Sequence, residues 1–193
     1  MDSLEKLNIA LFGLGRAGKF HIQSIQSIPE LNLKCVMDLN ESVAKRVAKD
    51  LECSYSTDID EPLSQNDIDA VIIATPTKEH HQQVQAALKA NKPVFSEKPL
   101  GNSLNEIDSC FELAKQTDLP LFIGFNRRFD PSFSSLASDV KDSKVGQLQM
   151  LRVTSRDSPL PTMDYISKSN GIFPVSYTHL RAHETREDLV WRL

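Results

Sequence analysis

The chain has 193 residues, of which 40% are hydrophobic and 25% charged, an ordinary globular composition that suffices for one domain and part of a second. A net charge of -4 and a pI near 5.7 argue against a nucleic-acid partner. Because the sequence shows no secretory apolar segment and no stretch near the roughly 18 apolar residues of a membrane span, we expect a cytoplasmic protein without a membrane partner. Three cysteines without metal-ligand spacing suit a reducing compartment, and we expect no metal site.

The first predicted strand, 7–12, is an apolar run that leads directly into a glycine-rich turn, Gly13-x-Gly15-x-x-Gly18. In a dinucleotide-binding turn, one glycine lets the chain reverse, the next lets the backbone approach a pyrophosphate, and the third lets the helix pack on the strand. The phosphates then lie at the helix N-terminus, where free N–H groups favour negative charge. The alternative is a glycine turn without a ligand. We predict that the turn contacts a dinucleotide through Gly13, Gly15, Arg16, Ala17 and Gly18.

A helix at 17–28 and a strand at 33–37 are predicted next. Apolar residues recur along the helix at roughly helical spacing, at Phe20, Ile22, Ile25 and Ile28. Asp38 ends the strand about 20 residues after Gly18, where a carboxylate can accept hydrogen bonds from the adenosine ribose. Its charge would repel the extra phosphate of NADP, so Asp38 favours NAD. The alternative is that the segment Asp38-Leu39-Asn40 only ends the strand and caps the next helix.

The chain continues with a polar helix at 41–50, a short strand at 53–55, a helical turn at 59–64 and a strand at 69–74, whose two apolar faces predict a central position. Thr75 and Pro76 follow this strand at the edge where ligands collect in an open α/β sheet, so we expect both to line the cofactor groove. Thr77 is the predicted cap of a helix reaching residue 90. His80, one turn into it, either contacts the cofactor or is an ordinary surface histidine, and His81 must point elsewhere.

A strand at 94–96 precedes Glu97-Lys98-Pro99, and a helix at 103–117, capped by Ser103 with Glu106 at the capping-box position, precedes a strand at 121–125. Six strand patterns with helical patterns between them predict an α/β fold, a doubly wound parallel sheet of the Rossmann type. The polar segment 126–131 breaks this alternation. A helix at 132–140 and an alternating strand at 147–154 then open a second unit, which we expect to be the incomplete start of an α+β substrate domain.

With Glu97-Lys98-Pro99 in place, the sequence resembles the Gfo/Idh/MocA oxidoreductases, the family of glucose–fructose oxidoreductase and inositol dehydrogenase. The resemblance covers residues 7–173 and rests on five ordered motifs: G-L-G-R-A-G at 13–18, A-T-P-T-K-E-H at 74–80, F-S-E-K-P-L at 95–100, G-F-N-R-R-F-D at 124–130 and S-N-G-I-F at 169–173. The fourth motif, with V-T-S-R-D at 153–157, is most similar to the myo-inositol 2-dehydrogenase branch.

The resemblance implies an NAD-dependent oxidation of a secondary alcohol on a cyclic polyol or sugar. In this family the lysine of the E-K-P motif, here Lys98, lies beside the nicotinamide and the reacting carbon, and the bond to Pro99 is often cis. Glu97 would contact the nicotinamide ribose, and Asn126 and Arg127 would line the polyol pocket. A partly desolvated lysine beside the cationic ring has a lowered pKa, so it can take or relay the alcohol proton and stabilise the developing alkoxide.

After residue 173 the family pattern stops and the composition shifts. Family members continue with a segment that carries an Asp and a His and with a large open sheet. We expect residues 174–193 to be foreign to the family; they resemble translated sequencing-adapter sequence, and an alternative exon is the other explanation. His179 and His183 lie four apart, but no third metal ligand accompanies them. The predicted division is 1–125 for the dinucleotide-binding domain, 126–173 for the incomplete substrate domain and 174–193 for the atypical tail.

Three functions follow from this sequence. The first is the N-terminal half of an NAD-dependent polyol dehydrogenase, inositol-like, that binds NAD but turns over little. The second is a dinucleotide-sensing regulatory module that catalyses nothing. The third is a reductase that acts on another sugar, on biliverdin or on a dihydrodiol. The R-R-F-D and S-R-D segments argue against this third function. The expected partner is a small polyol or sugar; a homo-oligomer is expected of a full-length relative and is doubtful for this chain.

Overall fold

The computed structural model describes residues 6–150. The chain divides into two compact units, Met1–Gly124 and Phe125–Leu193, and each is described by itself. The motifs predicted at 153–157 and 169–173 lie outside the described residues, as does the tail at 174–193 with His179 and His183.

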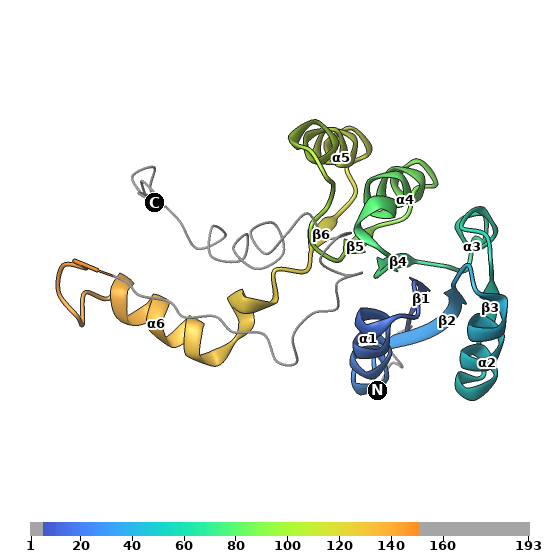
Figure 1. The fold of residues 1–193 in the computed structure, drawn as a ribbon, viewed down its shortest axis with the longest axis horizontal. Helices are drawn as coiled ribbons and strands as arrows, with labels where there is room; N and C mark the ends of the chain where they lie inside the picture. The colour runs from blue at the N-terminus through green and yellow to red at the C-terminus, as the bar shows by residue number, and fades with distance from the viewer. Residues whose placement is uncertain (1–5, 151–193) are drawn as a thin grey trace, which may run out of the picture. The chain divides into compact units, whose positions relative to one another are not determined.

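A six-stranded parallel sheet forms the centre of the first unit (Figure 1). Its strands lie in the order β3-β2-β1-β4-β5-β6, and every neighbouring pair is parallel. The doubly wound α/β fold is confirmed, and so is the central place of β4, between β1 and β5. The strands are Leu7–Phe12 (β1), Leu31–Met37 (β2), Ser54–Ser56 (β3), Ala70–Ile73 (β4), Val94–Ser96 (β5) and Leu121–Ile123 (β6).

Helices cover both faces of this sheet, with α1 and α2 on one face and α4 and α5 on the other (Figure 1). The strands are therefore apolar on both sides: on β1, Ala10 and Phe12 pack in the core with α4 and α5, while Leu11 packs in the core with α2. The helices are Arg16–Ser27 (α1), Glu41–Leu51 (α2), Asp60–Leu63 (α3), Thr77–Lys89 (α4) and Leu104–Thr117 (α5).

Each helix starts within one residue of the start that the sequence predicted, and one predicted N-cap residue is wrong. Thr77 is the first residue of α4 and Pro76 is its N-cap, because the fixed φ of proline, here -61°, already fits the extended cap position. Ser103 caps α5 as predicted, by accepting a hydrogen bond from the Glu106 N–H. The Glu106 carboxylate reaches back one residue further than a capping box requires and accepts from the Asn102 N–H.

The predicted apolar stripe of α1 is only partly buried. Ile25 is 3% exposed, whereas Phe20 is 60% and Ile28 42% exposed. The physical reason is that, within the described part of the first unit, no third helix follows α1 and α2 on this face. An apolar cavity of about 270 Å³ lies between α1 and the strands there, and its wall includes Phe95 and Phe122.

The described part of the second unit contains a 3₁₀ turn, η1 (Asn126–Phe129), and a helix, α6 (Pro131–Lys141). The helix predicted at 132–140 is therefore confirmed. Asp130 caps it by accepting from two backbone N–H groups, those of Ser132 and Phe133. Of the strand predicted at 147–154, the described part, 147–150, is not a strand, because a strand needs a paired neighbour and the described residues of this unit provide none. The rest of it lies outside the described residues.

Candidate functional site

The three glycines after β1 have three different structural tasks. Gly13 has a φ of +88°, and a Cβ on it would lie 2.6 Å from the carbonyl oxygen of Ala74. A Cβ on Gly18 would lie 2.0 Å from the carbonyl oxygen of Gly13, so α1 packs against the turn with no room for a side chain. A Cβ on Gly15 would meet nothing within 4 Å. The first and third glycines are thus required by the fold, and the middle one leaves space for a ligand.

The N-terminus of α1 is open to an anion. Gly15 is the N-cap, no side chain caps the helix, and its first turn contains no acidic residue. Arg16 begins the helix and is exposed, and Ala17 beside it is half-buried. Backbone N–H groups at such an end, together with the helix dipole, favour a phosphate group. This turn therefore fits the pyrophosphate of a dinucleotide.

Asp38 stands at the carboxyl end of β2, next to the glycine turn. Its Oδ2 accepts a hydrogen bond from the Leu14 N–H at 2.9 Å, and its Oδ1 accepts from the Asn40 N–H at 2.9 Å. Asn40, not Asp38, caps α2, by accepting from the Val43 N–H. The segment Asp38-Leu39-Asn40 therefore does end the strand and cap the next helix, through Asn40, while the Asp38 carboxylate also binds the glycine turn. Since a carboxylate oxygen accepts more than one hydrogen bond, the held carboxylate retains capacity for ribose hydroxyls.

Thr75 and Pro76 follow β4, which lies directly beside β1: the Ala74 N–H donates to the Phe12 carbonyl at 2.7 Å. Thr75 is half-buried, and its hydroxyl donates to Oε1 of Gln83 at 2.7 Å. Pro76 is exposed. The strand order reverses between β1 and β4, and ligands of open α/β sheets bind at that point.

His80 lies inside the unit rather than on its surface. It is 1% exposed, and both of its ring nitrogens lie 2.7 Å from backbone carbonyl oxygens, those of Thr75 and Pro99. The ring is occupied on both sides, which corrects the prediction of a direct cofactor contact: His80 has no unengaged ring nitrogen for one. His81 is half-buried and contacts the hydroxyl of Ser109.

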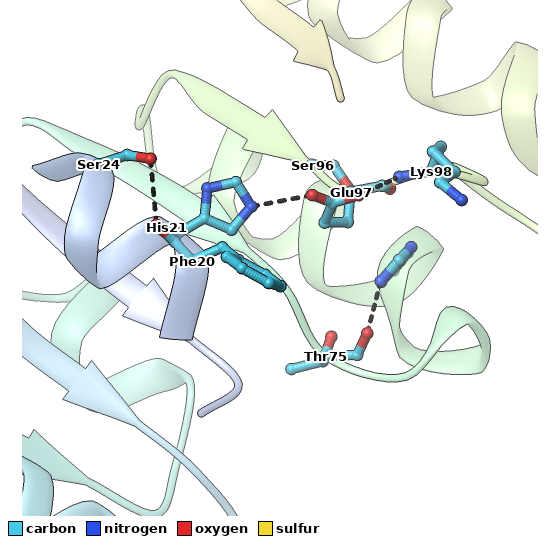
Figure 2. Close-up of polar contacts among 8 residues, drawn as sticks. Phe20, His21, Ser24, Thr75, Ser96, Glu97 and Lys98 are labelled. Atoms are coloured by element: carbon cyan, nitrogen blue, oxygen red, sulfur yellow. Dashed lines mark hydrogen bonds and ion pairs between the residues drawn. The ribbon is translucent and has the colours of Figure 1, made fainter. Parts of the chain in front are cut away.

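Glu97 and His21 form a pair that the sequence patterns did not reveal. The carboxylate of Glu97, at the end of β5, faces the ring of His21 on α1 (Figure 2), and Oε1 lies 2.9 Å from Nε2. The His21 ring also packs edge-on against Phe95, with 5.3 Å between centroids. The other oxygen of Glu97 accepts from the Lys98 N–H at 3.3 Å. His21 lies one turn beyond Gly18, and that position was its only signal in the sequence.

The environment of Glu97 favours its charged form. Burial on its own raises the pKa of a carboxyl group, but the hydrogen bond and charge of His21, with the N–H and charge of Lys98, outweigh it. The net pKa of Glu97 is lower than its ordinary value. The site therefore holds a carboxylate anion next to Lys98.

Lys98 follows Glu97 at the same edge of the sheet and is half-buried. The peptide bond between Lys98 and Pro99 is cis, as the family resemblance implied. Asn126 and Arg127 belong to the second unit, where they lie in η1; the Arg127 guanidinium lies over the ring of Phe133, 5.3 Å from its centroid. Their contact with a substrate stays a prediction.

Neither a metal cluster nor a membrane helix emerges from the described residues. Between residues 6 and 150, no group of three or more His, Cys, Asp or Glu side chains is placed to hold a metal ion. Over the same range, none of the helices has both the length and the apolar character needed to cross a membrane.

Comparison with known proteins decides the family. Residues 7–125 match the model of an oxidoreductase family with an NAD-binding Rossmann fold, GFO/IDH/MocA. This chain is a member of the Gfo/Idh/MocA family. The Gfo/Idh/MocA assignment makes the first unit an NAD-binding Rossmann domain, and the open α1 terminus and the held Asp38 carboxylate fit that cofactor.

The similar Gfo/Idh/MocA proteins include inositol dehydrogenases. The chain is 38% identical to myo-inositol 2-dehydrogenase of Thermotoga maritima and 35% identical to inositol 2-dehydrogenase of Rhizobium meliloti, covering 86% of this chain and 50% of each relative. A structure of scyllo-inositol dehydrogenase from Lactobacillus casei with bound NAD(H) and scyllo-inositol matches with a TM-score of 0.70 and 34% identity, over 74% of this chain and 43% of that one. The chain therefore spans about half the length of the relatives it matches.

Proposed function

We propose that the protein containing this chain oxidises a secondary alcohol of a cyclic polyol, myo-inositol-like, with NAD as the hydride acceptor. The observation that carries the proposal is the place of Lys98. It follows β5 at the sheet edge that also holds the glycine turn, beside a carboxylate that His21 keeps oriented. The similarity to inositol dehydrogenases supports a polyol as the substrate.

In this proposal each group at the edge has one task. The N-terminus of α1 binds the pyrophosphate, and the Asp38 carboxylate binds the adenosine ribose and disfavours the 2′-phosphate of NADP. Glu97 orients the nicotinamide ribose. For Asn126 and Arg127 of the second unit, we propose only that they bind the polyol.

Lys98 accepts the proton of the alcohol. Bound NAD would accept the hydride that leaves the alcohol carbon. The Lys98 ammonium first releases a proton to solvent. The hydroxyl proton then passes to the neutral amine as the carbonyl forms, and the ammonium that results stabilises the developing negative charge on oxygen. The products are a ketone, reduced cofactor and a protonated lysine, which is the form in which the lysine began.

The three cysteines support a reducing compartment. Cys35, Cys53 and Cys110 are free thiols, and two of them are buried. Burial raises the pKa of Cys53 and of Cys110 to about 11, which keeps these thiols protonated and unreactive. We propose the cytoplasm as the location on this basis.

The proposal is tested in two steps. Calorimetry with the 193-residue chain measures binding of NAD and of NADP, and we expect NAD to bind more tightly. The longest reading frame that contains this chain is then assayed for NADH formation with myo-inositol, scyllo-inositol, glucose and a dihydrodiol. We expect inositol-dependent NADH formation. Binding of NAD without turnover of any substrate would favour the dinucleotide-sensing module, and absence of NAD binding would contradict the proposal.

A further inference from the structure

We propose that His80 is a positioning residue, which ties the backbone after β4 to the backbone after Lys98 and so holds the nicotinamide end of the site in place. The inference rests on the proposed function, because it concerns the segment that carries Lys98. It assigns to His80 a task that involves no contact with the cofactor.

The tie consists of two short polar contacts made by one ring. Nε2 lies 2.7 Å from the carbonyl oxygen of Thr75, and Nδ1 lies 2.7 Å from the carbonyl oxygen of Pro99. His80 itself is 1% exposed and fixed in α4. A helix with a buried ring is a rigid anchor, so the two segments that follow β4 and β5 are held to the same point.

The number of N–H groups on the ring limits how these contacts can form. Both partners are carbonyl oxygens, which only accept, so a hydrogen bond to either one needs an N–H from the ring. A neutral imidazole has one N–H and an imidazolium has two. Each ring nitrogen lies at hydrogen-bond distance from one of the two carbonyls, so the ring stands between the two segments and an N–H on either nitrogen binds one of them.

The surrounding contacts extend the tie on both sides. The Thr75 hydroxyl is bound to Gln83, one turn further along α4, and Gln83 is 6% exposed. On the other side, Leu100 follows Pro99 and is buried in the core cluster that includes Val84 of α4. The segment with Lys98 is thus fastened immediately after the lysine, and the ring of His80 is the polar part of that fastening.

The position of the tie predicts a selective effect on binding. The adenosine end of NAD belongs to the glycine turn and Asp38, neither of which contacts His80 by any bond described above. The nicotinamide end belongs to the segment of Lys98. Loss of the tie should therefore weaken binding of NAD and spare binding of ADP, which lacks the nicotinamide half.

The test compares His80→Phe, which keeps the ring size but has no N–H, with His81→Phe as the matched control on the neighbouring residue. Calorimetry on the 193-residue chain measures the Kd of NAD and of ADP. We expect His80→Phe to raise the Kd of NAD about tenfold and that of ADP less than twofold, because the two buried carbonyls lose the ring N–H that lies between them. His80→Gln, which keeps a donor, should recover part of the loss, and His81→Phe should change neither Kd.

A second measurement needs no variant. Nitrogen-15 NMR of the wild-type ring should show a His80 N–H hydrogen-bonded to a backbone carbonyl; a ring whose N–H makes no such bond would overturn the tie. Equal weakening of NAD and ADP by His80→Phe would also overturn it, since a merely structural role predicts that result. If the wild-type chain does not bind NAD, the proposed function fails, whereas the NMR result still tests the tie by itself.

Discussion

His21 and Glu97 lie 76 positions apart in the sequence, yet His21 Nε2 and Glu97 Oε1 are separated by 2.9 Å. The pair joins the helix after the glycine turn to the end of β5 (Figure 2). Because Lys98 is the next residue after Glu97, and its N–H donates to the same carboxylate, the pair also sets the direction in which the chain leaves β5. One hydrogen-bonded pair therefore connects the helix after the glycine turn to the proposed catalytic lysine.

Removal of the His21 ring should destabilise the domain. His21→Ala leaves a carboxylate that is largely shielded from water without its main partner, so we expect the free energy of unfolding to fall by about 1–3 kcal/mol, measured by urea denaturation. We also expect weaker NAD binding. Gln23→Ala, an exposed position of the same helix, is the control and should leave stability unchanged. Equal stability of His21→Ala and the control would contradict a structural role for the pair.

The charge on Glu97 should make stability depend on pH. Its pKa in the folded state lies below the ordinary 4.5, so the carboxylate contributes stability that is fully present above about pH 5 and is lost as the pH falls through the folded pKa. Glu97→Gln lacks this titration. We expect the difference in unfolding free energy between wild type and Glu97→Gln to shrink below pH 4.5. A free-energy difference that grows as the pH falls would contradict a lowered pKa of Glu97.

The glycine turn offers a matched pair of substitutions. A methyl group on Gly18 would overlap the Gly13 carbonyl, so Gly18→Ala should lower the unfolding free energy by about 1–3 kcal/mol. A methyl group on Gly15 meets nothing within 4 Å, so Gly15→Ala should fold normally and lose NAD affinity, because it fills the space left for the pyrophosphate. Thermal unfolding and calorimetry separate the two effects. Unchanged NAD binding by Gly15→Ala would place the cofactor elsewhere.

Asp38 should determine the choice of cofactor. Asp38→Asn keeps the shape and the acceptor for Leu14 but removes the charge, so we expect the preference for NAD over NADP to fall about 10- to 100-fold. The control is Asp69→Asn. Asp69 accepts a hydrogen bond from the Asn8 N–H near the start of β1, at the edge of the sheet opposite to the glycine turn. Ratios of Kd from calorimetry provide the measurement. Retention of the full NAD preference in Asp38→Asn would assign the discrimination to other residues.

Lys98 should be needed for turnover and not for binding. In the longest reading frame, we expect Lys98→Ala to lower inositol-dependent NADH formation about 10²- to 10⁴-fold, because the alcohol proton then has no acceptor, and to change NAD affinity little. Lys89→Ala, an exposed lysine in the last turn of α4, serves as the control. If Lys98→Ala retained near-normal turnover, another group would have to take the proton.

The sequence predicted those features that depend on short stretches of chain. The apolar run before Gly13, the glycine spacing and Asp38 at a strand end each carry their own signal, and the structure contains all of them in the expected places. Errors arose where local signals compete. Thr77 and Pro76 both suit a helix start, and Phe20 suits a buried helix face that the first unit leaves open.

By itself, then, the sequence determined the order of strands and helices, the glycine turn and the family, because hydrophobic periodicity and turn chemistry act over a few residues. Only the tertiary structure decided that His21 faces Glu97 and that His80 is buried between two carbonyls. A histidine has no local pattern that distinguishes a surface position from a buried donor. Its role depends on which strand ends the parallel sheet brings together, and long-range packing alone determines that.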